Sequence, residues 1–99
     1  MEAAEVEAKL IEELKVNSVY KDDIKQYLVT PEKAPLIDIE GNETAMWIVF
    51  RKNEYVLVYD ESNNEFGVGY RTIVDELVFS GFSGTVYDAY ERLVRRNSD

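Results

Sequence analysis

The hydrophobic pattern changes its period once along the chain, and this change limits the available folds. Before residue 31 apolar residues recur every three or four positions, as on one face of an amphipathic helix. From residue 44 the segments TAMWIVF, YVLVY and NEFGVGY are rich in β-branched and aromatic residues and are separated by RKNE and ESNN. The sequence therefore predicts helices first and then a three-stranded antiparallel meander.

The helical part contains two candidate helices. Residues 3–15 form the first, and SVYKDDIKQYLV either forms a second helix capped by Asn17 or Ser18 or continues the first. The prolines of TPEKAP end the helical pattern, so this segment is predicted to be a connector. The segment LIDI after it is a possible edge strand, followed by a turn at EGNE.

The meander needs two hairpin turns, which we place at Lys52-Asn53 and Asn63-Asn64 because asparagine tolerates positive φ. This register predicts a smaller face that carries Trp47, Val49, Val56 and Val58 beside Gly67 and Gly69, and that packs against a helix. The other face is aromatic, and either a helix covers it or it binds a partner. Its predicted members are Met46, Ile48, Phe50, Tyr55, Leu57, Tyr59, Phe66, Val68 and Tyr70.

The C-terminal part is predicted to be helical. The segment RTIVDELVF has a helical apolar spacing, although its β-branched residues leave an added strand as an alternative. The segment SGFSGT before TVYDAYERLVRR resembles a phosphate-binding loop in its glycines, but it contains no basic residue. We therefore predict a structural role, in which Ser83 or Thr85 caps the last helix and Asp88 completes a capping box with Thr85.

These elements predict an α+β domain with a three- to four-stranded antiparallel meander between N-terminal and C-terminal helices, in the order α-α-β-β-β-α-α. The whole chain, residues 1–99, is one domain by length. Its parts are a helical segment at 1–30, a connector with a possible edge strand at 31–43, the meander at 44–70 and a helical segment at 71–96.

The composition limits the kinds of catalytic, metal and binding site that the chain can form. The chain has no cysteine and no histidine, which excludes thiolate and imidazole chemistry at a metal or catalytic site. No pair of carboxylates converges by sequence, so we expect a non-enzymatic protein without cofactor or metal. A net charge of −9 disfavours binding to nucleic acid or anionic membranes and favours a basic partner. No apolar segment has the length of a membrane span, which predicts a cytoplasmic protein.

The acidic excess is concentrated between Ala34 and Glu91, where eleven acidic residues accompany three basic ones. This distribution suggests a small acidic protein-binding module, such as an immunity, antitoxin, inhibitor or nucleic-acid-mimic protein. The alternative is a small-ligand or regulatory domain with a pocket between sheet and helix. The candidate interface joins tyrosine-face residues to nearby acids: Tyr55, Tyr59, Phe66, Tyr70, Glu54, Asp60, Glu61 and Glu65.

Overall fold

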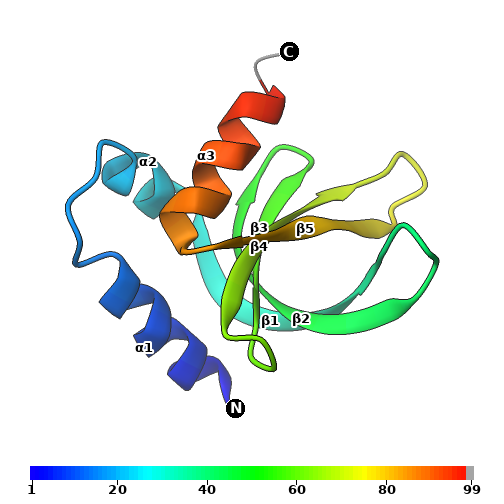
Figure 1. The fold of residues 1–99 in the computed structure, drawn as a ribbon, viewed down its shortest axis with the longest axis horizontal. Coiled ribbons are helices and arrows are strands. Elements are labelled where there is room, and N and C mark those ends of the chain that lie inside the picture. Colours follow the sequence, from blue (N-terminus) through cyan, green and yellow to red (C-terminus); the bar gives the residue numbers. More distant parts are fainter. Residues whose placement is uncertain (98–99) are drawn as a thin grey trace.

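The computed structural model describes residues 1–97 and contains three helices and five strands (Figure 1). Two helices precede the strands and one follows them. The elements are α1 (Ala3–Glu13), α2 (Lys21–Gln26), β1 (Leu28–Ile37), β2 (Glu43–Lys52), β3 (Tyr55–Asp60), β4 (Glu65–Arg71), β5 (Leu77–Gly84) and α3 (Val86–Asn97).

The predicted α+β class is confirmed, with five strands in place of three or four. Sequential strands pair antiparallel, and the sheet closes into a small barrel in the order β1-β2-β3-β4-β5. The closing contact is short, because β1 and β5 pair in parallel only at Ile37 and Val78. Figure 1 shows the three helices on one side of the barrel.

The segment TPEKAP, predicted to be a connector, instead lies inside β1. Proline lacks a backbone donor but adopts the extended conformation of a strand that is paired along one edge. Here β1 pairs with β2 from Glu32 to Ile37, while its other edge meets β5 at a single position. The missing donors of Pro31 and Pro35 are therefore compatible with strand formation.

The helix predicted over RTIVDELVF is also wrong, and the strand alternative is correct. A tight turn over 72–76 reverses the chain, with Asp75 at φ 66° and the Thr72 hydroxyl accepting from the Glu76 amide at 3.2 Å. Strand β5 then pairs with β4, with Leu77 opposite Arg71. Turn chemistry here overrides an apolar spacing that also fits a helix.

A bulge in β2 exchanges part of the predicted sheet faces. The β2–β3 register shifts between Ile48 and Phe50, so Trp47 lies opposite Tyr59 while Phe50 lies opposite Leu57. Trp47 therefore joins the aromatic face, and Ile48 leaves it together with Met46. The first predicted turn is nearly correct, since it lies at Asn53-Glu54, one residue later than expected. The second is a loop over 61–64 between Asp60 and Glu65 rather than a two-residue turn at Asn63-Asn64, although Asn64 has the predicted positive φ of 53°.

The two faces form two hydrophobic cores. The helix-covered core joins the aromatic face to α1, α2 and α3, and its buried members include Val6, Leu10, Ile24, Trp47, Phe50, Leu57, Tyr59, Phe66, Val86, Tyr90 and Leu93. The inner core fills the barrel with Leu36, Met46, Ile48, Val56 and Val58, against which Val29, Ala34, Leu77, Phe79 and Phe82 pack.

Both glycines of β4 face the inner core, so their predicted packing against a helix is wrong. A Cβ atom on Gly67 would lie 2.7 Å from the carbonyl oxygen of Gly81 in β5. A Cβ atom on Gly69 would lie 2.9 Å from Cδ2 of Leu36 in β1 and 3.0 Å from the carbonyl oxygen of Val78. The missing side chains allow the strands to approach closely enough to close so small a barrel.

Candidate functional site

The tyrosine face predicted from the sequence is mostly buried. Tyr59 and Phe66 are only 2% and 1% exposed, because α1 and α3 cover them, while Tyr55 and Tyr70 are half-buried. The Tyr59 hydroxyl donates to Oδ1 of Asn64 at 2.7 Å. Burial, with the nearby charges of Glu61 and Asp60, raises the pKa of Tyr59 above 10.0. Two of the four aromatic candidates are thus core residues.

The predicted acidic residues do not form one surface either. Asp60 is buried and accepts from the Ser62 amide and the Asn63 side chain, so it holds the β3–β4 loop. Glu61 accepts from Lys33 at 2.8 Å and pairs with the N-terminal amine, and these hydrogen bonds lower its pKa.

Glu54 is exposed and Glu65 is half-buried, and they lie at opposite ends of the β3–β4 hairpin. Asp60 and Glu61 are thus bound to groups of the protein itself, whereas Glu54 and Glu65 lie far apart on the hairpin.

The segment SGFSGT has the predicted structural role. The Thr85 hydroxyl accepts from the Asp88 amide at 3.1 Å, and the Asp88 carboxylate accepts from the Thr85 amide at 3.5 Å, which is the expected capping box. The segment belongs to the end of β5. Arg92, from the next helix, donates to the carbonyl oxygens of Ser80 and Phe82 at 2.6 and 3.2 Å, a contact that was not predicted from the sequence.

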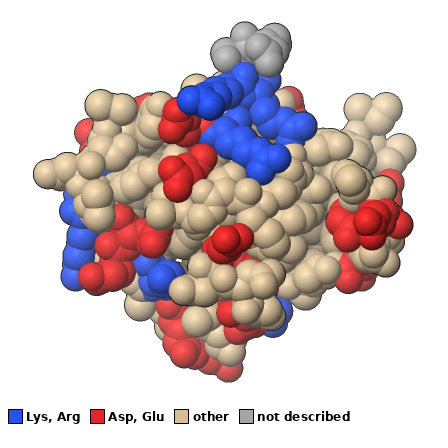
Figure 2. Space-filling model, in the orientation of Figure 1, with Lys and Arg blue, Asp and Glu red and all other residues tan. Residues whose placement is uncertain are grey.

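Basic side chains gather over α3, as Figure 2 shows, but they bind groups of the protein itself. Arg92 covers carbonyl groups at the edge of β5, Arg96 donates to the Ser80 hydroxyl, and Arg95 pairs with Glu91 at 2.6 Å. This cluster closes the end of β5 and neutralises the end of α3. It therefore needs no external anion to explain it.

Three exposed apolar side chains lie in the turns 38–42 and 72–76. Ile39 is 94% exposed, Ile73 is fully exposed and Val74 is 68% exposed. One groove is lined by Ile37 and Glu43, which flank the first turn, and by Asp75 and Glu76 of the second, and Figure 1 shows both turns away from the helices. Exposed apolar side chains grouped on neighbouring turns, rather than scattered singly, are the usual mark of a contact surface.

Acidic residues lie on or next to the same two turns. We define the loop-end surface as Ile39, Ile73 and Val74 together with Asp38, Glu40, Glu43, Asp75 and Glu76. Asp38 accepts from the amides of Glu40 and Asn42, both at 2.9 Å, and so shapes its turn. Arg71 pairs with Asp75 at 2.7 Å. Among the described residues, the carboxylates of Glu40, Glu43 and Glu76 make no hydrogen bond or ion pair, so these charges face solvent uncompensated.

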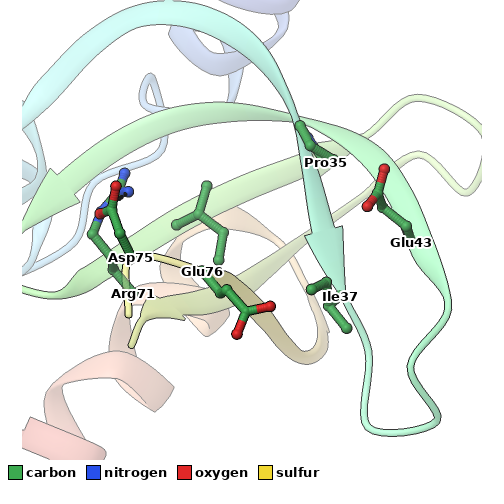
Figure 3. A pocket seen from close by; sticks show the side chains of 7 residues that line it. Pro35, Ile37, Glu43, Arg71, Asp75 and Glu76 are labelled. Atoms are coloured by element: carbon green, nitrogen blue, oxygen red, sulfur yellow. Dashed lines mark hydrogen bonds and ion pairs between the residues drawn. The ribbon is translucent and has the colours of Figure 1, made fainter. Parts of the chain in front are cut away.

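A shallow groove of about 260 Å³ crosses the loop-end surface (Figure 3). Its apolar lining comes from Pro35 and Ile37 of β1 and Leu77 of β5, and its charged lining from Glu43, Arg71, Asp75 and Glu76. In Figure 3, Ile37 lies between Glu43, at the start of β2, and Glu76, in the β4–β5 turn. The groove thus combines an apolar floor with carboxylates from two separate elements.

This surface was not predicted from the sequence for two reasons. Ile73 and Val74 were assigned to a helix face, and Ile39 was assigned to the possible edge strand LIDI. A usable signal was present, since DIEGNE and IVDE each place isoleucine beside carboxylates in a short polar break. What the sequence did not show is the contact of β1 with β5, where one groove joins residues next to the first turn with residues of the second.

Comparisons with protein-family models, with curated proteins and with solved structures gave no match for this chain. Within residues 1–97, no cluster of three or more potential metal ligands has a geometry that could hold an ion. Over the same residues, none of the helices has the length and apolar character needed to span a membrane.

Proposed function

We propose that this protein is a non-enzymatic protein-binding module that engages a basic protein partner through the loop-end surface. The observation that carries the proposal is three exposed aliphatic side chains on two turns that also carry or border five acidic residues. The proposed surface differs from the one expected from the sequence, because Tyr59 and Phe66 are core residues and the exposed apolar side chains of the loop end are aliphatic.

The two kinds of side chain have separate roles in this proposal. Burying Ile39, Ile73 and Val74 against a partner removes apolar surface from water and slows dissociation. Uncompensated carboxylates such as Glu40 attract a basic partner over about 10 Å at 0.1 M salt and speed association. Binding should therefore weaken as the salt concentration rises, mainly through a slower association rate.

A second candidate function is the binding of a small apolar ligand in the groove between α1 and β1. This groove measures about 280 Å³ and lies between a helix and the sheet, as the alternative requires. Its lining residues are Glu7, Leu10, Ile11, Leu28, Val29, Thr30 and Pro31. The volume is just below the range of about 300–1,000 Å³ that is usual for ligand sites, and Ile11 at its rim is 52% exposed.

One capture experiment with matched variants tests both functions. The wild type, the Ile39→Ser/Ile73→Ser double variant and an Ile11→Ser variant are immobilised and exposed to extract of the source cell at low and high salt. We expect a basic protein to be retained by the wild type and by Ile11→Ser, released by salt, and lost from the double variant. Equal retention by all three proteins, or loss only with Ile11→Ser, would contradict the assignment to the loop-end surface.

A further inference from the structure

We infer that the groove of the loop-end surface receives one long cationic side chain of the partner, with its aliphatic stem on the floor and its charge between Glu43 and Glu76. This inference rests on the proposed function, because it concerns how the same surface recognises its partner. It adds a specific contact to what is otherwise a general attraction between opposite charges.

The floor of the groove suits an aliphatic stem. Pro35, Ile37 and Leu77 supply its apolar lining, and Pro35 is exposed while the other two are half-buried. Lysine and arginine bury their methylene stems along apolar surface and keep the charged group in water. An acidic side chain would fit the floor equally well in shape, so charge must decide the choice.

The charges at the rim select a cation. Arg71, which is the basic residue of the groove, is already paired with Asp75 at 2.7 Å. Glu43 and Glu76 have no partner among the described residues, and both are exposed. They come from different elements on either side of Ile37 (Figure 3). A compact ammonium group with three donors can satisfy two separate carboxylates at once.

The size of the groove fits a single side chain. Sites for whole cofactors or drug-sized ligands occupy about 300–1,000 Å³ and enclose most of the ligand. The groove here is smaller, about 260 Å³, and open to solvent. It is therefore suited to one residue that projects from a folded partner whose remaining contacts are made by Ile39, Ile73 and Val74.

A peptide titration tests the groove independently of the partner's identity. The probe is the blocked pentapeptide Ala-Ala-Lys-Ala-Ala, and the control probe carries acetyl-lysine, which has nearly the same stem without the charge. Amide signals of ¹⁵N-labelled protein are followed by NMR. We expect saturable shifts at residues 35–37, 43 and 76–77, and binding at least tenfold weaker for the acetylated peptide.

Two double variants with the same change in net charge complete the titration. Glu43→Gln/Glu76→Gln should weaken binding of the lysine peptide at least tenfold, while Glu54→Gln/Glu65→Gln should change it less than twofold. All four substitutions are at exposed or half-buried positions, so the NMR spectra should show an intact fold. Equal weakening by both double variants, or no saturable shift at the groove, would overturn the inference.

Capture of the partner separates failure of this inference from failure of the proposed function. If Ile39→Ser/Ile73→Ser loses the partner while Glu43→Gln/Glu76→Gln retains it fully, the function stands and the groove inference is overturned. If Ile39→Ser/Ile73→Ser retains the partner, the proposed function itself fails. Loss of the partner from both double variants, with retention by Glu54→Gln/Glu65→Gln, supports both.

Discussion

The helix-covered core and the loop-end surface are built from similar ingredients but have opposite exposures. Both place apolar side chains close to acidic residues along neighbouring elements. Tyr59 and Phe66 are nevertheless 2% and 1% exposed, while Ile39 is 94% exposed and Ile73 is fully exposed. The difference comes from topology, because α1 and α3 pack on one side of the barrel and none of the helices within residues 1–97 packs on the turns 38–42 and 72–76 (Figure 1).

The largest expected effect comes from truncating the helix-covered core. Tyr59→Ala should lower the free energy of unfolding by about 3–5 kcal/mol, because it removes a buried aromatic ring and the hydrogen bond to Asn64. Urea denaturation measures this change. Tyr55→Ala, at the half-buried start of the same strand, is the control and should cost clearly less. Unchanged stability of Tyr59→Ala would mean that the helices do not cover this face in solution.

The inner core should respond next most strongly. Gly67→Ala adds a Cβ atom 2.7 Å from the carbonyl oxygen of Gly81 and 2.9 Å from Cε1 of Phe79. Overpacking of this kind costs about 1–3 kcal/mol, because backbone cannot move away as a flexible side chain can. Gly69→Ala should cost less, since two of the atoms it would meet belong to the side chains of Leu36 and Val56. The reverse order in thermal denaturation would contradict the barrel closure described here.

The sequence predicted the parts of the fold that are determined locally. The period-two segments of β2, β3 and β4, the positive φ of Asn64 and the Thr85–Asp88 capping box all follow from nearby residues. The bulge near Val49 was not predictable, because a one-residue shift in register leaves no mark in the alternation of apolar residues. Because the bulge was not predicted, Trp47 was assigned to the wrong face of the sheet.

Long-range pairing explains the remaining errors. Strand β5 forms because the turn 72–76 returns the chain to β4, and β1 forms despite two prolines because β2 lies beside it. The candidate site depends on both of these strands, because Ile39 follows β1 and Ile73 lies in the turn before β5. The acidic composition could be read from the sequence, but the identity of the apolar residues that remain exposed could not.

The start of α3 offers a smaller and more local test. Thr85→Ala removes the hydroxyl that accepts from the Asp88 amide, and loss of such a cap costs about 1 kcal/mol. Thr85→Ser should retain most of the stability, because serine caps helices equally well. Chemical denaturation of the three proteins would show this order, and equal stability of wild type and Thr85→Ala would exclude a capping role.

Alkaline pH should weaken the helix-covered core selectively. Burial raises the pKa of Tyr90 above 10.0, with added contributions from Asp23, Tyr27 and Tyr20, and burial also raises that of Tyr59. The unfolded chain then ionises first, so the stabilisation present below pH 10 is lost as pH rises through the folded-state pKa. Tyr90→Phe should therefore show a smaller decline in unfolding free energy above pH 10 than the wild type. Parallel declines would contradict this assignment.

The smallest expected effect on stability belongs to the loop-end surface. Ile39→Ser and Ile73→Ser should each change the free energy of unfolding by less than about 0.5 kcal/mol, because both side chains are already in water in the folded protein. An isoleucine in the inner core gives the contrast, since Ile48 is fully buried and Ile48→Ser should destabilise strongly. If Ile73→Ser instead destabilised the protein as Ile48→Ser does, the turn 72–76 would pack against the barrel in solution. Its isoleucine would then be part of the core and would not be available to a partner.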